Sequence, residues 1–508
     1  MTADVCLVLE GTYPYVSGGV SGWTHDLLIE QSHRTFALLC LRAPNGPTEP
    51  VYDVPDNVVE IVNVELQKLP IKGTKLKKEQ RRSLIKQLKE PIIKLQTDPT
   101  LEDLQYILDI SQQYGRLGQD VLINSTEAFD MLVSMYTETL PFTSFLDYFW
   151  SWRSLVGGLF SILEAPIPEA RCYHALCTGF AGLYLCKTSL ITKKPCLLTE
   201  HGIYTNERRI EIGTADWLDD EQSLNFNTDQ RVASKSLRDF WIDSFTGYSK
   251  LTYQVAQWSV TLYEGNKELQ IEDGADPDRL RIIPNGIDFD SYSHLVRKNS
   301  GPPVIGFIGR VVPIKDIKTL IRAANFLVET VPEAMIYIMG PTSEDEDYYR
   351  ECTELVDHGN LQNTVKFLGK VNIKAYLDKI DVLVLTSLSE AQPLVILEAG
   401  AVGVPSIATD VGSCSELIFG REDEEPQLGP GGIICPLASP SAVGEAMAKL
   451  LTDRIYYERC SQAIKTRVDS YYRKEMQNRD YDDLYDRLLA LEEVDVLKHS
   501  GMRLPEEL

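Results

Sequence analysis

The sequence predicts an α/β protein built from two doubly wound, parallel-sheet domains. Short apolar runs rich in β-branched residues alternate with helical patterns near the start of the chain, and they do so again after residue 303. The chain has 508 residues, which is more than a single hydrophobic core usually supports. We therefore expect a first Rossmann-like domain over residues 1–296 and a second over residues 303–470.

The first domain begins with a strand, a glycine-bearing loop and a helix. The strand is expected at residues 5–9 and the helix at about residues 20–31, with Gly18 and Gly19 in the loop between them. Glycines at such a place let the backbone approach a ligand closely. Helical patterns rich in aromatic residues predict an insertion around residues 66–163. Further strands of this domain are expected at residues 35–41, 58–64, 171–176, 195–199 and 280–284.

The second domain follows a polar linker at residues 297–303. Its apolar runs alternate with helical patterns, so we expect a second doubly wound sheet. Six strands are expected, at residues 304–307, 334–339, 365–368, 382–385, 406–408 and 433–435.

The stretch at residues 387–403 is the most informative part of the chain. It follows a buried strand, and Pro393 stands where the first turn of a helix accepts proline. The N-terminus of that helix would face the carboxyl edge of the sheet, where α/β sheets bind ligands and where free N–H groups suit a phosphate. Glu390 lies in the loop and Glu398 in the helix, and ionised carboxylates accept strong hydrogen bonds from hydroxyls.

Basic residues follow the first strand of the same domain. Gly309 and Arg310 end that strand, and Lys315 comes five residues after Arg310. Arginine makes a two-pronged contact with a phosphate, and lysine adds a point charge. A basic pair on one loop and a carboxylate pair on another predict a site for an anionic, hydroxyl-rich ligand, such as a nucleotide sugar.

The composition indicates which partners the protein is not expected to bind and in which cellular compartment it is expected. The 50 basic and 74 acidic side chains give a net charge of −24, which argues against a nucleic acid or an anionic membrane as the main partner. No signal-peptide pattern and no apolar run of roughly 18 residues is present, so a cytoplasmic protein is expected. The ten cysteines contain no Cys-x-x-Cys and no zinc-ligand spacing, which indicates reduced thiols and no metal site.

One basic segment stands out in this acidic chain, at residues 68–97. Its apolar residues fall at helical spacing, so an amphipathic helix is expected. Two interpretations stay open. The basic face either docks onto a membrane-associated partner or acidic lipid, or is the solvated face of the insertion.

Further motifs, taken with Arg310, Lys315, Glu390 and Glu398, carry a family resemblance. They are EGTYPYVSGGVSGW at residues 10–23, TEHGIYT at residues 199–205 and IPNGID at residues 283–288. Together they resemble the retaining GT-B glycosyltransferases of family four, and among these the PelF-like enzymes of Pel exopolysaccharide synthesis. The resemblance runs from residue 4 to about residue 489. Each motif alone is weakly specific, whereas their order and spacing are specific.

The resemblance implies a fold and an activity. The two domains would face each other across a cleft, with the acceptor on the first, the donor on the second, and residues 471–508 crossing back as helices. The enzyme would move a hexosyl unit from a UDP-sugar to a growing exopolysaccharide of the biofilm matrix, with retention of configuration and without a metal or other cofactor. UDP-glucose, UDP-N-acetylglucosamine and their galacto epimers all stay open. The cytoplasmic enzyme would be recruited to the inner membrane by a Pel synthesis and export complex.

The resemblance also assigns roles to the site residues. Gly18 and Gly19 would lie near the donor phosphates and the acceptor, and His201 near the reacting carbon of the donor sugar. Glu390 would bind sugar hydroxyls. Gly309 would belong to the donor loop. Arg310 and Lys315 would hold the leaving diphosphate. Glu398 would hold the ribose.

One departure from the family pattern affects the phosphate site. Many members have Gly-Phe-Gly after the first glutamate, and this chain has Ala391-Gln392-Pro393. Pro393 has no N–H group to donate. The amides that cradle the diphosphate therefore have to come from among Gln392, Leu394 and Val395.

Two other functions remain open. A glycoside hydrolase could use Glu390 and Glu398 as its acid and nucleophile. That reading leaves Arg310 and Lys315 unexplained, because a neutral glycan needs no phosphate-binding residues. A catalytically silent scaffold of a secretion complex is the other alternative, and the intact basic and acidic motif residues argue against it.

Overall fold

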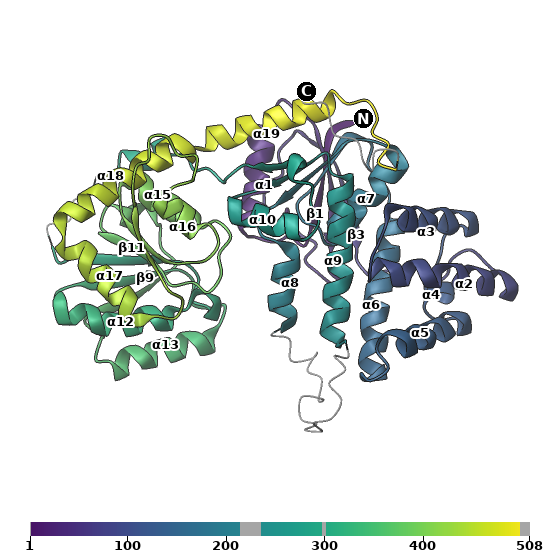
Figure 1. The fold of residues 1–508 in the computed structure, drawn as a ribbon, viewed down its shortest axis with the longest axis horizontal. Helices are drawn as coiled ribbons and strands as arrows, with labels where there is room; N and C mark the ends of the chain where they lie inside the picture. Colours follow the sequence, from purple (N-terminus) through teal and green to yellow (C-terminus); the bar gives the residue numbers. More distant parts are fainter. Residues whose placement is uncertain (1, 214–234, 297–300, 498–508) are drawn as a thin grey trace. The chain divides into compact units, whose positions relative to one another are not determined.

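The computed structural model describes residues 2–213, 235–296 and 301–497, and these form two compact units. The first unit comprises the described residues up to Thr261, Asn266–Ile282, and those from Asp482 onward. The second comprises Leu262–Gly265 and the described residues of Ile283–Tyr481. Each unit contains a parallel sheet with helices packed on it, so the predicted α/β class with two parallel-sheet domains is confirmed (Figure 1).

The first unit contains a seven-stranded parallel sheet in the order β3-β2-β1-β4-β5-β6-β7. The central strand β1 is almost wholly buried and pairs with β2 on one side and β4 on the other. The order in which the chain adds strands therefore reverses between β1 and β4. The strands are β1 (Ala3–Glu10), β2 (Phe36–Arg42), β3 (Val58–Glu65), β4 (Ala170–Ala175), β5 (Cys196–Glu200), β6 (Trp258–Thr261) and β7 (Leu280–Ile282).

Between β3 and β4 the chain forms a helical insertion, α2 to α6. Its helices bury apolar stripes, which join the core of the first unit. Several basic residues of α2 pair with acids of the same insertion, as in Arg81–Glu127 at 3.3 Å and Lys89–Glu138. The helices of this unit are α1 (Gly19–Glu30), α2 (Lys78–Leu95), α3 (Leu101–Tyr114), α4 (Gln119–Leu122), α5 (Thr126–Thr139), α6 (Phe145–Glu164), α7 (Phe180–Thr192), α8 (Tyr204–Gly213), α9 (Leu237–Val255) and α10 (Glu264–Glu272), whose first two residues belong to the second unit.

The second unit contains a six-stranded parallel sheet in the order β10-β9-β8-β11-β12-β13. All six strands predicted for this domain are present. They are β8 (Val304–Ile308), β9 (Met335–Met339), β10 (Val365–Gly369), β11 (Val382–Leu385), β12 (Ser406–Thr409) and β13 (Gly432–Cys435). The helices are α11 (Asp290–Ser293), α12 (Ile317–Thr330), α13 (Glu346–His358), α14 (Lys374–Leu377), α15 (Leu394–Val402), α16 (Cys414–Phe419), α17 (Pro440–Thr452), α18 (Arg454–Tyr471) and α19 (Lys474–Leu489), the last of which ends in the first unit.

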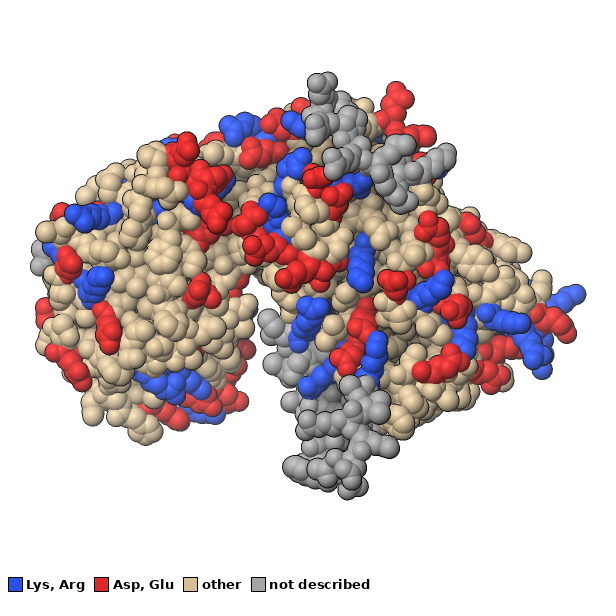
Figure 2. Space-filling model, viewed as in Figure 1, with Lys and Arg blue, Asp and Glu red and all other residues tan. Residues whose placement is uncertain are grey.

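Each unit buries its own hydrophobic core. All ten cysteines lie in described residues as free thiols, and nine of them are buried. No helix in the described part of the chain is long and apolar enough to cross a bilayer. Figure 2 shows acidic and basic side chains interspersed over the visible face, with basic ones gathered near α2 at its right-hand edge.

Candidate functional site

Two loops at the carboxyl edge of the second sheet are held side by side. One follows β8 and the other follows β11, and these strands are neighbours in the sheet. The N–H of Leu388 donates to the carbonyl of Ile314 at 2.8 Å, which joins the two loops directly. Thr409, at the end of β12, donates its hydroxyl to the carbonyl of Ser387 at 2.5 Å. Residues from three strand ends therefore form one polar surface.

Lys315 and Glu390 meet on this surface. Lys315 Nζ lies 2.5 Å from Glu390 Oε1, and the hydroxyl of Ser387 donates to the same oxygen at 2.6 Å. The two charged side chains are only 19% and 12% exposed. A largely desolvated ion pair interacts more strongly than one in open water. This cluster therefore brings a lysine ammonium group and a carboxylate that can accept hydrogen bonds from hydroxyl groups together at one place.

The backbone at Asp316 explains why Lys315 points into the site. Residues Pro313–Lys315 form a single 3-10 turn, and Asp316 takes a left-handed conformation with φ of 41°. Its side chain then accepts the N–H of Thr319 and caps α12. The turn and the cap together fix Lys315 at the end of its loop.

Arg310 lies on the same loop but has a different partner. Its guanidinium donates to Glu344 at 2.7 Å, and both side chains are about half exposed, at 56% and 43%. Gly309 N–H donates to the carbonyl of Met339 at the end of β9. A Cβ at Gly340 would lie 1.9 Å from the carbonyl oxygen of Gly309, so only glycine fits there. The structure thus holds the backbone of Gly309 firmly and leaves the Arg310 side chain at the surface.

The loop before α15 is fastened through Gln392. Its side-chain amide accepts the N–H of Asn285 at 2.7 Å and donates to the carbonyl of Asn285 at 3.1 Å. Ala391 accepts the N–H of Ser413 at 2.9 Å. Gly412, with φ of +56°, packs so tightly that a Cβ there would lie 2.1 Å from the carbonyl oxygen of Glu390. The departure from the family pattern therefore gives the Gln392 side chain a structural contact with the backbone of Asn285.

The N-terminus of α15 supplies the other predicted donors. Pro393 is its N-cap and provides no side-chain cap. The N–H groups of Leu394 and Val395 lie in the first turn, where they have no partner inside the helix. Leu394 is 41% exposed. This end of α15 has the partial positive charge and the free donors that suit an anion.

Glu398 lies one and a half turns further along α15 and is paired with Tyr292. The tyrosine hydroxyl donates to Glu398 Oε1 at 2.9 Å, and Lys374 Nζ lies 4.5 Å from the centre of the tyrosine ring. Burial raises the pKa of Glu398, while the hydrogen bond from Tyr292 and the charge of Lys374 act in the opposite direction. Tyr292 was not predicted as a site residue, because it lies more than 100 residues away in the chain.

The first unit carries the remaining predicted residues. Gly18 and Gly19 form the end of the loop after β1 and the start of α1. Gly18 has an extended backbone, and a Cβ at either glycine would meet no other atom within 4 Å. The two glycines therefore leave an open surface of bare backbone at the carboxyl edge of the first sheet.

His201 follows β5 at the same edge and packs against Trp23 of α1. The two rings meet edge to face with their centres 4.7 Å apart. Nε2 of His201 is buried and has no hydrogen-bond partner in the described residues. Burial lowers the pKa of His201 to about 4, so the ring is neutral at pH 7. Trp23 links His201 to the helix that begins at Gly19, and it was not predicted as a site residue.

A buried network behind His201 fixes the end of β5. The carboxylate of Glu200 is fully buried and accepts hydrogen bonds from Tyr253 at 2.6 Å, Gln270 at 2.9 Å and Thr178 at 3.1 Å. Burial raises the pKa of Glu200. Breaking such a network is costly because it leaves buried polar groups unpaired. Glu200 therefore acts on the site by positioning His201.

No cluster of three or more His, Cys, Asp or Glu side chains with metal-binding geometry is found in residues 2–213, 235–296 and 301–497.

Two family models match the chain. Residues 3–278 match the model described as Domain of unknown function (DUF3492), and residues 288–467 match the one described as Glycosyl transferases group 1. The first match spans more than half of the chain and covers the sheet that carries Gly18, Gly19 and His201. The second covers the sheet that carries Lys315, Glu390 and Glu398.

Curated relatives match a shorter stretch. A UDP-Gal:alpha-D-GlcNAc-diphosphoundecaprenol alpha-1,3-galactosyltransferase of Escherichia coli is 28% identical over 198 residues, which is 36% of this chain and 49% of the relative. A D-inositol 3-phosphate glycosyltransferase of Pseudarthrobacter chlorophenolicus is 32% identical over 165 residues, which is 30% of this chain and 39% of the relative. The chain thus spans half or less of the length of these relatives.

Solved structures share the fold over nearly the whole chain. HepE of Anabaena, solved in complex with UDP, matches 95% of this chain and 100% of its own, with a TM-score of 0.58 and 14% identity. Sucrose-phosphate synthase of Thermosynechococcus elongatus matches 96% of this chain and 99% of its own, with a TM-score of 0.56 and 15% identity. These likenesses confirm the predicted GT-B class.

Proposed function

Because the chain belongs to the family described as Domain of unknown function (DUF3492), and its second unit matches the group 1 glycosyl transferases, we propose that it is a glycosyltransferase that uses a UDP-sugar. The observation that carries the proposal is the Lys315–Glu390–Ser387 cluster, at the same sheet edge as the free first turn of α15. The cluster places a lysine that can bind a phosphate beside a carboxylate that can accept hydrogen bonds from hydroxyl groups. A relative named as a UDP-Gal-dependent galactosyltransferase and the structure of HepE in complex with UDP support this donor class.

In the proposed reaction, the bond between the anomeric carbon and the UDP oxygen breaks, and its electron pair stays on the diphosphate. An acceptor hydroxyl attacks on the same face, and its proton passes to the departing diphosphate, so the configuration is retained. Lys315, Arg310 and the N–H groups of Leu394 and Val395 stabilise the charge that develops on the leaving group. These fixed positive groups supply the stabilisation that a divalent cation gives in other transferases, so we propose that turnover needs no metal.

The other site residues hold the sugars. Glu390 binds hydroxyls of the transferred hexose while Lys315 balances its charge, and Glu398 binds the ribose. Gly18 and Gly19 give the acceptor and the phosphates close access to bare backbone. His201, neutral at pH 7, lies beside the reacting carbon, and its backbone carbonyl favours the positive charge that develops there.

The finer identity rests on the sequence motifs at residues 10–23, 199–205 and 283–288. They favour transfer to a growing exopolysaccharide of the Pel type, by a cytoplasmic enzyme that an inner-membrane synthesis and export complex recruits. The alternatives are less well supported. A hydrolase would need Glu390 and Glu398 as an acid and nucleophile pair, and here they contact different groups, Lys315 with Ser387 and Tyr292 respectively.

The test is release of UDP from four donors, UDP-glucose, UDP-galactose, UDP-N-acetylglucosamine and UDP-N-acetylgalactosamine, measured with and without excess EDTA. We expect one donor or an epimeric pair to be turned over, at the same rate in EDTA. Turnover that stops in EDTA and returns with magnesium or manganese would refute the metal-free mechanism. No turnover of any UDP-sugar, together with turnover of another nucleotide sugar, would refute the donor assignment.

A further inference from the structure

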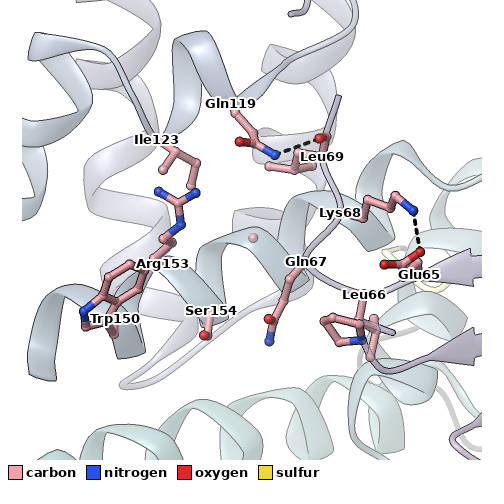
Figure 3. Close-up of a pocket in the computed structure, with 12 residues that line it drawn as sticks. Glu65, Leu66, Gln67, Lys68, Leu69, Gln119, Ile123, Trp150, Arg153 and Ser154 are labelled. Atoms are coloured by element: carbon pink, nitrogen blue, oxygen red, sulfur yellow. Dashed lines mark hydrogen bonds and ion pairs between the residues drawn. The ribbon is translucent and has the colours of Figure 1, made fainter. Parts of the chain in front are cut away.

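A pocket of about 320 Å³ opens at the carboxyl ends of β2 and β3 in the first unit. Pro44 follows β2, Glu65 ends β3 and residues 66–69 follow it, and α4 and α6 of the helical insertion close the other side (Figure 3). Its volume falls within the range of small-ligand pockets. The motifs of the donor and acceptor sites do not include any of its lining residues.

One face of α6 supplies a wall of this pocket. Trp150, Arg153, Ser154 and Gly157 lie at positions i, i+3, i+4 and i+7, so they form a single stripe on the helix. Trp150 is 56% exposed, and the guanidinium of Arg153 lies 5.8 Å from the centre of its ring. A large aromatic side chain left open to solvent beside a pocket provides a flat apolar platform.

The polar groups around this platform have unused hydrogen-bonding capacity. The amide of Gln67, the hydroxyl of Ser154 and the indole N–H of Trp150 form no hydrogen bond with any residue that the structure describes, and Arg153 forms no ion pair there. Gln67 lies against α6, since a Cβ at Gly157 would lie 3.6 Å from its Cα. Together these groups offer several donors and two acceptors within one pocket. The charge of Lys68 is balanced by Glu65 at 2.6 Å, which leaves Arg153 as the one unbalanced cation of the lining.

The backbone at Gln67 is a second sign of a ligand site. Gln67 has φ of 63°, in the left-handed region that residues other than glycine rarely adopt. Its N–H donates to Ser161 of α6 at 3.2 Å, which holds the strained turn against the insertion. Strained backbone of this kind concentrates at binding sites, where it aims a side chain. Here it aims the Gln67 amide into the pocket.

The pocket shares a sheet edge with the loop that carries Gly18 and Gly19. Strands β1, β2 and β3 are parallel neighbours, so the loops that follow them leave the same edge. Two strand spacings, roughly 10 Å, separate the ends of β1 and β3. A chain-like ligand that enters beside Gly18 can therefore extend along the edge to this pocket.

We propose that this pocket is a saccharide subsite that holds a pyranose unit of the glycan acceptor, away from the reacting end. The sugar ring stacks on the exposed face of Trp150, and the amide of Gln67, the guanidinium of Arg153 and the hydroxyl of Ser154 bind its hydroxyls. A flat apolar face surrounded by both donors and acceptors fits a ring whose faces are apolar and whose rim carries hydroxyls. As an acceptor subsite, this proposal rests on the proposed glycosyltransferase function.

The test measures binding of hexasaccharides of glucose, galactose, N-acetylglucosamine and N-acetylgalactosamine to the full chain by titration calorimetry. We expect the parent to bind at least one of them, and Trp150→Ala to weaken that binding by about tenfold or more, because a central aromatic contact carries much of the affinity. Leu146→Ala is the matched control, since Leu146 is 62% exposed on the same helix and lies outside the pocket. Its affinity should equal that of the parent.

Gln67→Gly separates a binding role from a structural one. Glycine accepts the left-handed backbone without strain, so the melting temperature should stay the same or rise. Loss of hexasaccharide affinity in this variant supports the subsite. Parental affinity in both Trp150→Ala and Gln67→Gly, or no binding of any hexasaccharide by the parent, would overturn it.

Donor turnover distinguishes this proposal from the function on which it rests. If the parent turns over a UDP-sugar and Trp150→Ala yields products of parental length, the subsite is wrong and the transferase function stands. If hexasaccharides bind through Trp150 but no nucleotide sugar is turned over, the saccharide site stands and the transferase function fails. Products that become shorter in Trp150→Ala, at unchanged donor KM, support both.

Discussion

Burial sets the protonation state of two histidines in the first unit. His174 is fully buried between the hydroxyls of Tyr485 at 2.8 Å and Thr199 at 2.9 Å. Burial, and to a lesser degree the neighbouring His201, lower the pKa of His174 to about 3. Both rings are therefore neutral at pH 7, and His174 supports the strand that precedes His201.

Because the pKa of His174 is lowered, we predict that the free energy of unfolding decreases in acid. Its folded pKa lies below the ordinary value of 6.5, so between these values the unfolded chain binds a proton that the folded protein does not. The free energy of unfolding should fall as the pH drops from about 6.5 toward 3. His174→Gln keeps a hydrogen-bonding side chain without this titration. Denaturant unfolding should show that the parent loses about 2–3 kcal/mol more than His174→Gln between pH 6.5 and 4.5.

One result would contradict this assignment. Equal slopes for the parent and His174→Gln across this pH range would show that His174 is not the group responsible.

A second prediction concerns the contribution of Glu398 to binding of the UDP-sugar donor. The ribose does not change during transfer, so the contact with Glu398 is equally strong in the ground and transition states. A hydrogen bond to a charged group contributes roughly 1.5–3 kcal/mol. Glu398→Ala should raise the KM for the UDP-sugar by about 10–100-fold and change kcat only slightly. Steady-state kinetics measure both, and a loss confined to kcat would be incompatible with a ribose contact.

At the scale of elements, α18 depends on one buried arginine. Arg467 and Glu424 are each 1% exposed and pair at 2.6 Å. The guanidinium also donates to the carbonyls of Ile418 at 2.8 Å and Gly429 at 2.7 Å. This residue therefore joins α18 to the end of α16 and to the chain that enters β13.

Removal of Arg467 should be strongly destabilising. Arg467→Ala leaves the Glu424 carboxylate buried and unpaired, which costs roughly 3–5 kcal/mol of unfolding free energy. Arg454→Ala is the control, because its pair with Glu458 on the same helix is exposed and should contribute less than about 1 kcal/mol. Chemical unfolding of both variants measures the contrast. A similar small effect for both would mean that the buried pair does not hold α18 in place.

The strands show what the sequence could predict. All six strands of the second sheet follow from apolar runs, because parallel strands are buried on both faces and read as continuous hydrophobic segments. The short strand β6 (Trp258–Thr261) was not predicted. Its four residues include a serine and a threonine, and its place in the sheet comes from pairing with β5 and β7. Tertiary pairing of this kind leaves no local pattern.

The residue types and positions of the candidate site stay a prediction from the sequence, and their contacts could not be predicted at all. The sequence placed Lys315, Glu390 and Glu398 at the carboxyl edge of one sheet, where the structure has them. It could not predict that Glu390 pairs with Lys315, nor that Gln392 binds the backbone of Asn285, 107 residues away. Such contacts join loops that are distant in the chain, so local propensity carries no information about them.

For the whole molecule, we predict that the nucleotide stabilises the folded state. A ligand that binds only the folded state stabilises it by about 2.7 kcal/mol at a hundredfold excess over Kd. UDP should therefore raise the melting temperature of the full chain, with and without EDTA. Thermal melts in UDP, ADP and GDP make the comparison, and a shift in ADP or GDP without one in UDP would contradict a UDP-sugar donor.

The most direct test of the central claim is the kcat/KM of Lys315→Ala for the UDP-sugar. Lys315 acts on charge that grows as the diphosphate leaves, and each 1.36 kcal/mol is a factor of ten in rate. We predict that kcat/KM falls by on the order of 10²–10³, whereas Lys318→Ala, whose charge pairs with Glu351 of α13, stays within a few-fold of the parent. Parental kcat/KM in a folded Lys315→Ala enzyme would mean that the diphosphate leaves from another place, and the loop after β8 would then not be the donor site.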